Sequence, residues 1–200
     1  MEITKRAKTT TWLCGSAPAK GAKGVLEKYA SDCVDKDLLS FAEGIKKKAQ
    51  TVEEAIVDIL SVFNTNGSTR PIIGSWMVRQ MLVNTASAIF NKKDNKTHPS
   101  RAVIPISIGI VKPNFIPLFR GENEITTADF VQTYTVSIEK PTKRSFFKAY
   151  EVLEEGVEFD VTMSFNEDIM NQECIDLLLD NAQYVGLGAY RARFGKFEWI

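Results

Sequence analysis

The sequence has few of the residues on which many enzymes and secreted proteins rely. It contains one histidine, His98, and three cysteines, Cys14, Cys33 and Cys174, with no C-x-x-C spacing. One histidine leaves a single base for Ser–His or Cys–His catalysis, and three scattered cysteines argue against a disulfide framework or a zinc finger. The chain also has no run of eighteen apolar residues and no apolar N-terminal segment, which argues against a transmembrane helix and a secretory signal. We therefore expect a soluble, cytoplasmic protein.

The charges balance overall but are segregated along the chain. The sequence has 25 basic and 25 acidic residues in 200, so net charge alone indicates no affinity for nucleic acid. Ten of the acids lie in 151–180, a segment without lysine or arginine. The basic residues cluster elsewhere, in 5–28, 92–101, 140–148 and 191–196. A neutral protein segregated in this way can carry one basic face that attracts phosphates, or only a dipolar surface with no nucleic acid involved.

Hydrophobic periodicity and turn signals predict an α+β protein. A capping box, Thr51 with Glu54, begins a helix that should end at 64–67, and the most periodic helix covers 73–90. Asn166 or Asn171 should cap a last helix through about residue 179. We expect strands within 3–13, 103–110, 115–119, 130–138 and 157–165 and near the C-terminus, with a loop or hairpin tip at 140–148.

This order of elements predicts a β-α-β-β-α-β core. Such a core forms a ferredoxin-like (RRM-like) antiparallel sheet with the helices on one face. We expect a single domain over 1–200, in which 15–68 form an inserted loop and helical excursion after the first strand. On the helix 73–90, the predicted amphipathic face carries Trp76, Met77, Gln80, Met81, Asn84 and Ala88.

The C-terminal segment VGLGAYRARFGKFEW combines glycine, cations and aromatic rings. Gly186, Gly188 and Gly195 permit tight turns and close approach of a ligand to the backbone. Cations alternating with rings suit a flexible nucleic-acid strand, because cations contact phosphates and rings stack on bases. The residues concerned are Tyr190, Arg191, Arg193, Phe194, Lys196 and Phe197. Alternatively, the glycines form a β-bulge and the aromatic rings enter the core.

This segment resembles the C-terminal glycine-rich loop of the RAMP superfamily, the ferredoxin-like backbone proteins of CRISPR effector complexes. It is still more similar to their small stand-alone relatives from bacteriophages. Those relatives end in a G-x-G-x-x-R-x-x-F-G-x-F-E pattern, matched here by Gly186, Gly188, Arg191, Phe194, Gly195, Phe197 and Glu198. Residues 71–86 resemble their first helix, and the likeness covers about 70–95 and 130–200.

The resemblance implies a module that holds single-stranded DNA or RNA by its backbone in the bacterial host cytoplasm. Related subunits often stand in a row, which implies a homo-oligomer or filament. The basic positions that would extend the binding track are Arg70, Arg79, Lys92, Lys93, Lys143 and Arg144.

No enzymatic activity is expected, because the histidine or aspartate with which the ribonuclease members cut has no match here. No cofactor or metal is expected either: we interpret His98 as a surface residue and the aspartates Asp32, Asp35 and Asp37 as a solvated turn rather than a Mg²⁺ site. An alternative function remains open. The acidic segment 151–180 would mimic nucleic acid, and the protein would act as an anti-defence factor or structural subunit that binds a bacterial defence protein.

Overall fold

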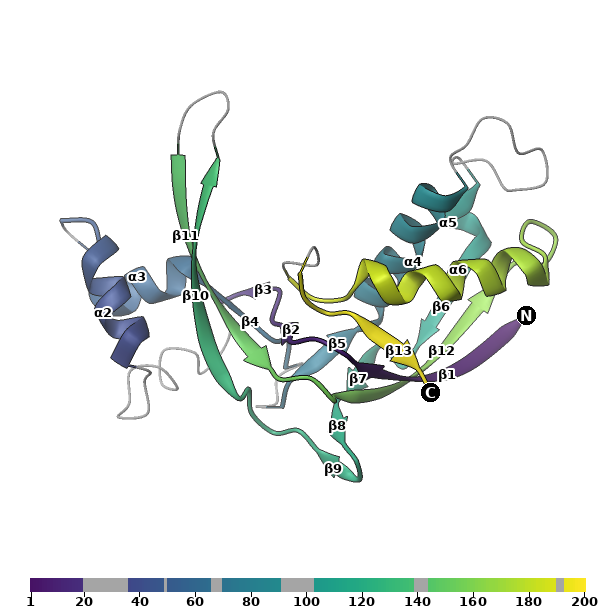
Figure 1. The fold of residues 1–200 in the computed structure, drawn as a ribbon, viewed down its shortest axis with the longest axis horizontal. Helices are drawn as coiled ribbons and strands as arrows, with labels where there is room; N and C mark the ends of the chain where they lie inside the picture. The colour runs from purple at the N-terminus through teal and green to yellow at the C-terminus, as the bar shows by residue number, and fades with distance from the viewer. Residues whose placement is uncertain (20–35, 49, 66–69, 91–102, 139–143, 190–192) are drawn as a thin grey trace.

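The computed structural model describes all residues except 20–35, 49, 66–69, 91–102, 139–143 and 190–192 (Figure 1). The helices are α2 (Lys36–Ile45), α3 (Val52–Ile59), α4 (Ser75–Ile89), α5 (Ile104–Ser107) and α6 (Gln172–Val185). The strands are β1 (Glu2–Thr9), β2 (Leu13–Cys14), β3 (Ala17–Pro18), β4 (Leu60–Val62), β5 (Ile72–Gly74), β6 (Ile108–Lys112), β7 (Phe115–Pro117), β8 (Phe119–Arg120), β9 (Asn123–Glu124), β10 (Phe130–Ile138), β11 (Arg144–Leu153), β12 (Glu158–Phe165) and β13 (Phe197–Trp199). These elements form two larger sheets and the small β5–β7 pair.

The first sheet has its central strands in the order β13-β1-β12-β6, each antiparallel to its neighbour. Alternate residues of β1 and β12 point to opposite faces, so Ala7, Phe159, Val161 and Met163 are buried while their neighbours are more exposed. Helices α4 and α6 pack on the buried face and contribute Met81, Leu82, Ile175 and Leu178, among others, to the main core. The opposite face of this sheet has no helix over it in the described part of the chain (Figure 1).

The second sheet is built on the long hairpin β10–β11. Strand β11 also pairs with β4 in parallel and with β2, and β3 pairs with β4. Helices α2 and α3 cover one face of this sheet and form a second core with Leu38, Ile56 and Ala149. In Figure 1 the hairpin stands between α2 and α3 on one side and the helices of the first sheet on the other. Residues 154–157 join β11 of the second sheet to β12 of the first, and the chain also passes between the two sheets at 10–12 and at 125–129.

The mixed α+β class predicted from the sequence is confirmed, and so are two helix starts. Thr51 Oγ1 accepts from Glu54 N, and Glu54 Oε2 accepts from Thr51 N at 2.9 Å, which is the predicted capping box of α3. Asn171 Oδ1 accepts from Cys174 N at 2.9 Å and caps α6. The single domain with 15–68 inserted stays a prediction, although the described part of that segment adds α2, α3, β3 and β4 to the second sheet.

Four local predictions were wrong. Residues 103–110 begin with the short helix α5 rather than a strand, and the predicted helix from Thr51 ends at Ile59, after which β4 begins. The predicted loop 140–148 contains the first residues of β11, from Arg144. Helix α4 buries Val78, Met81, Leu82, Thr85 and Ala86, so of the predicted face only Met81 is fully buried, and Trp76 is 51% exposed.

None of the helices in the described part of the chain is long and apolar enough to cross a membrane.

Candidate nucleic-acid interface

The described parts of the C-terminal tail, residues 186–189 and 193–200, lie against the start of the second sheet because their glycines allow it. Helix α6 ends at Gly186, which has φ +82°, and Gly188 and Gly195 also have positive φ. A Cβ atom at Gly188 would overlap the carbonyl oxygen of Cys14, and one at Gly195 would overlap that of Leu187. Backbone hydrogen bonds from Ala189 N to Cys14 O (3.1 Å) and from Gly195 N to Trp12 O (2.7 Å) hold this close approach. The glycines are therefore required by packing as well as by backbone conformation.

An aromatic cluster of Trp12, Phe130, Tyr134, Tyr150 and Phe194 lies where the tail meets β10 and β11. The Trp12 and Phe194 rings are stacked, with centroids 5.5 Å apart and planes at 20°. Phe130 meets Trp12 edge-on at 5.1 Å, and Tyr134 lies 6.1 Å from Phe194 and 5.9 Å from Tyr150. All five side chains are half-buried. Rings fixed against each other in this way lose little entropy when a planar ligand stacks on them.

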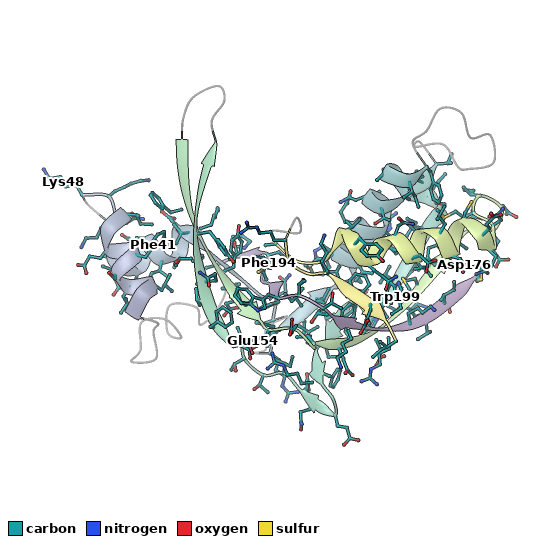
Figure 2. The ribbon with its side chains drawn as sticks, in the orientation of Figure 1. Phe41, Lys48, Glu154, Asp176, Phe194 and Trp199 are labelled. Atoms are coloured by element: carbon teal, nitrogen blue, oxygen red, sulfur yellow. The ribbon has the colours of Figure 1, made fainter. Side chains whose placement is uncertain are left out.

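The cluster lies on the face of the hairpin that α2 and α3 leave uncovered. Strand alternation separates it from Val131 and Ala149, which pack in the second core. Lys148 lies directly opposite Tyr134 in the register and shares its face. Figure 2 shows Phe194 beside the base of the hairpin on one side and Phe41, which contacts Phe147, on the other. The uncovered face thus combines rings with a cation.

Beside the cluster is a hollow of about 250 Å³, which we call the tail hollow. It is lined by Thr10, Thr11, Trp12, Glu155, Arg193 and Phe194. Three segments converge there and are tied together: Lys196 N donates to Thr11 Oγ1 at 3.0 Å, and Gly156 N donates to Thr9 O at 2.8 Å. Arg193 and Glu155 are both exposed at this site. The hollow therefore offers ring surface, a cation, a carboxylate and hydroxyl groups on a fixed frame.

The structure describes only part of the segment that carries the predicted tail contacts. Arg193 and Phe194 lie in a turn and a bend, and β13 begins only at Phe197. Tyr190 and Arg191 lie outside the described residues. Phe197 is 3% exposed and packs on Phe159 and Trp199, so for this ring the alternative of a core position is confirmed.

Three predicted phosphate contacts already hold the fold together. Lys196 Nζ donates to the carbonyl oxygens of Tyr184 and Val185 at the C-terminus of α6, and burial lowers its pKa. Arg79 donates to Ile108 O at 3.2 Å and also to Pro105 O. Arg70 forms an ion pair with Glu124. Their roles in binding nucleic acid stay predictions, as do those of Lys92, Lys93 and Lys143, outside the described residues, and of Arg144, whose side chain is also outside them.

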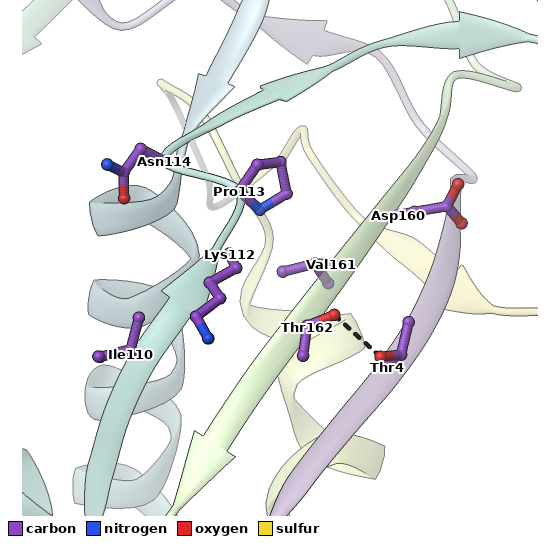
Figure 3. Close-up of a pocket in the computed structure, with 8 residues that line it drawn as sticks. All are labelled: Thr4, Ile110, Lys112, Pro113, Asn114, Asp160, Val161 and Thr162. Atoms are coloured by element: carbon purple, nitrogen blue, oxygen red, sulfur yellow. Dashed lines mark hydrogen bonds between the residues drawn. The ribbon is translucent and has the colours of Figure 1, made fainter.

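The exposed face of the first sheet is a different surface. It carries an open hollow of about 620 Å³ between β1, β12 and β6, where Thr4 and Thr162 hydrogen-bond at 2.9 Å (Figure 3). Its lining has no aromatic ring: the residues are Thr4, Ile110, Lys112, Pro113, Asn114, Asp160, Val161 and Thr162. Cations and carboxylates are matched across the strands, with Arg6–Glu158 at 3.2 Å, Lys8–Glu158 at 3.5 Å, Arg6–Asp160 at 3.8 Å and Lys112–Glu2 at 3.4 Å. The cations of this face are neutralised by these carboxylates, so the face is poorly suited to bind phosphates.

Several carboxylates of the acidic segment 151–180 are buried or have cationic partners, which the sequence of the segment does not indicate. Glu151 is 4% exposed and accepts from Phe63 N at 2.8 Å. Glu158 and Asp160 pair with cations of β1, and Glu167 pairs with the terminal ammonium of Met1 at 2.7 Å. The carboxylates that remain exposed on α6 are those of Glu173, Asp176 and Asp180.

The other candidate groups give no site in the described part of the chain. No group of three or more histidine, cysteine, aspartate or glutamate residues there is arranged to hold a metal ion. His98, Cys33, Asp32 and Asp35 lie outside the described residues, and so does the side chain of Asp37. Burial raises the pKa of the Cys14 thiol to about 12, which keeps it protonated and unreactive at neutral pH.

Comparison with known proteins yields distant likenesses to solved structures. No family model matches the chain, and neither does any curated protein. The chain is similar to a subunit in the cryo-EM structure of the Type III-B Cmr-beta bound to cognate target RNA, with 10% identity and a TM-score of 0.44, and it spans 60% of that subunit's length. It is also similar to Cmr6 from Pyrococcus furiosus, with 11% identity and a TM-score of 0.37, covering 98% of that chain. In both cases the whole of this chain is covered, but at TM-scores below 0.5 neither likeness decides fold or function.

Proposed function

We propose that this protein is a non-enzymatic single-stranded nucleic-acid-binding protein, and that it holds DNA or RNA on the aromatic cluster and the adjoining tail. The observation that carries this proposal is the joining of Trp12, Tyr134 and Phe194 with Arg193 and Lys148 on one uncovered face. Base–aromatic stacking contributes about 1–3 kcal/mol per base and tolerates any sequence, while the cations attract phosphates.

We also propose that the core is ferredoxin-like. Support comes from the chain order β1-α4-β6-β12-α6-β13 together with the antiparallel sheet order β13-β1-β12-β6. In RRM modules of this shape, bases stack on aromatic side chains of the exposed sheet face. In this protein, no aromatic residue lines the hollow on the exposed face of the first sheet, so we expect binding on the second sheet and the tail instead.

The RAMP-like pattern of the tail supports a phage-type protein that assembles along the strand as a homo-oligomer. The part of this pattern within the described residues is used for the close approach of the tail to Cys14 and Trp12. The same turns place Phe194 and Arg193 at the tail hollow. The pattern is therefore compatible with binding, and its glycines also allow the tail to pack closely against Cys14 and Trp12.

Fluorescence polarisation with labelled oligo-dT and oligo-U of about 20 nucleotides tests the proposed function. Binding in the micromolar range or tighter is expected, and it should weaken steeply with salt because neutralised phosphates release counterions. Absence of binding at low salt would overturn the proposal. Size exclusion with light scattering on the mixture would show whether several copies occupy one strand.

The alternative is a protein-binding role for the acidic face of α6. Three exposed carboxylates, Glu173, Asp176 and Asp180, accompany the exposed apolar surfaces of Leu177 and Tyr184. A basic partner would be attracted by this helix. This alternative would replace the first proposal if the protein binds no oligonucleotide and one protein from a bacterial lysate binds it stoichiometrically, in a manner lost after charge reversal of these carboxylates.

A further inference from the structure

We propose that the tail hollow receives a single base and favours bases that carry an amino group over uracil and thymine. This inference rests on the proposed function and names the part of the strand that the site recognises. Its basis is the position of Glu155, a carboxylate in the wall of a hollow whose other walls are aromatic rings, hydroxyl groups and a guanidinium.

The volume of the hollow suits one ring rather than a whole ligand. Its volume of about 250 Å³ is below the roughly 300–1,000 Å³ of clefts that enclose drug-sized molecules. The stacked pair Trp12 and Phe194 forms one wall, so a planar base has an apolar surface to lie against. Stacking of this kind does not select among bases, because every base has a π-face. Selection must come from the polar groups.

Glu155 supplies that selection because an ionised carboxylate only accepts hydrogen bonds. The amino groups of cytosine, adenine and guanine donate to such an acceptor. Uracil and thymine present a carbonyl oxygen where cytosine has its amino group, and two acceptors repel each other. Thr11 adds the complementary group: its Oγ1 accepts from Lys196 N, which leaves the hydroxyl hydrogen to donate to a base carbonyl.

The charged groups at the hollow are available for a ligand. Within the described part of the chain, neither Glu155 nor Arg193 forms an ion pair, and both are exposed. The guanidinium of Arg193 can therefore meet the phosphate next to the bound base. The backbone on either side of Glu155 is held in place, because Glu154 N donates to Asp129 Oδ2 at 2.8 Å and Gly156 N donates to Thr9 O.

The test compares the full-length protein with two neighbouring variants on two oligonucleotides. Oligo-C and oligo-U of equal length differ at two neighbouring ring positions: cytosine has an amino group at C4 and an accepting N3, whereas uracil has a carbonyl at C4 and an N3–H. We expect the wild type to bind oligo-C about tenfold more tightly than oligo-U at pH 7.5. Glu155→Gln should bring the two affinities within about twofold, because an amide both accepts and donates. Glu154→Gln removes the same charge next to the hollow without lining it, and it should keep the preference.

The outcomes separate this inference from the proposed function. Equal, salt-dependent binding of oligo-C and oligo-U by the wild type would overturn the base preference while nucleic-acid binding stands. If Glu155→Gln and Glu154→Gln lose the preference for oligo-C equally, the preference arises from the net charge near the hollow and not from a contact with Glu155. That result would also overturn the proposed base preference. Failure to bind either oligonucleotide would overturn both proposals together.

Discussion

The two exposed sheet faces of this protein differ in how their charges are used. On the first sheet, Arg6, Lys8 and Lys112 each have a carboxylate within 4 Å, and the hollow between the strands has no aromatic lining. On the uncovered face of β10 and β11, rings gather around Phe194, and Arg193 has no carboxylate partner among the described residues. Counting charges in the sequence cannot distinguish these faces, since both carry cations.

Whether a cation can bind a phosphate therefore depends on whether it already forms an ion pair with a neighbouring carboxylate. A cation that already has a carboxylate neighbour must give up that interaction, and the carboxylate then repels the incoming phosphate. Surface ion pairs are worth only about 0–1 kcal/mol for stability, but they neutralise the local field. A strand should therefore avoid the first sheet and bind where rings and free cations adjoin.

The largest effect is expected from Gly188→Val, which removes the tail from the binding face altogether. Valine cannot readily adopt φ +76°, and its Cβ would overlap Cys14 O. Backbone strain alone costs about 1–3 kcal/mol, and the overlap adds to it. We expect loss of cooperative unfolding in a urea titration followed by circular dichroism.

Gly44→Val is the matched control for that substitution. Gly44 lies in α2, and a Cβ atom added there would have nothing within 4 Å, so the same change should leave the unfolding midpoint nearly unchanged. Equal damage from both variants would show that the tail geometry is not the cause.

The next effect concerns the cations of the two faces. Arg191→Ala with Arg193→Ala should lower oligonucleotide affinity at least tenfold, about 1.4 kcal/mol. The slope of log affinity against log salt should become shallower by about 1.4, because each lost contact to a single strand accounts for about 0.7. Arg6→Ala with Lys8→Ala removes two cations from the charge-matched face and should change affinity less than twofold. Fluorescence polarisation measures both, and the reverse ranking would place the strand on the first sheet.

A smaller effect is expected from Phe194→Leu, which keeps an apolar side chain but removes the ring. Affinity should fall about fivefold, close to 1 kcal/mol, because one stacking surface is lost. Trp76→Leu is the control, since Trp76 is exposed on α4 and contacts Phe115 rather than the aromatic cluster. Equal losses in the two variants would indicate a general effect of aromatic surface and not a site at the tail.

The last effect concerns the free energy of unfolding and the hydrogen bonds of Asp129 at the start of the link between β11 and β12. Asp129 accepts from Arg120 Nη1 at 3.0 Å and from Glu154 N at 2.8 Å, and the hydrogen bond with Arg120 lowers its pKa below the ordinary 3.8. Its contribution is therefore complete above pH 3.8 and is lost as pH falls through the lower folded value. Asp129→Asn should cost about 1 kcal/mol of unfolding free energy at pH 7. In urea titrations that cost should shrink below pH 3.8, whereas a constant difference would contradict the assignment.

Sequence patterns predicted the elements whose ends have chemical signals. Thr51 with Glu54 and Asn171 place their helices correctly because a side-chain cap is a local interaction. Short apolar runs gave less accurate predictions: 103–110 divides into α5 and β6, and Leu60 begins a strand. A short apolar run has too few residues to show whether its period is that of a helix or of a strand.

The candidate site was predicted only in part. The tail gave Arg193 and Phe194, but Trp12 and Glu155 come from distant segments that meet only after folding. The alternation of Phe130, Gln132 and Tyr134 was a usable signal, since it places both rings on one face of a strand. Lys196 has a structural contact that its motif does not indicate: its Nζ donates to two carbonyl oxygens at the end of α6, and its predicted phosphate contact stays a prediction.

The link between β11 and β12 sets a limit on how this protein can vary in length. Glu154, Gly156 and Val157 each donate a backbone hydrogen bond to Asp129 or Thr9, and Gly156 has φ +86°. Inserting or deleting one residue here would turn the side chains of one strand to its opposite face, exchanging core for solvent across a whole sheet. Related sequences should therefore tolerate insertions at other exposed turns, such as Gly121 between β8 and β9, but keep a constant number of residues between these two strands.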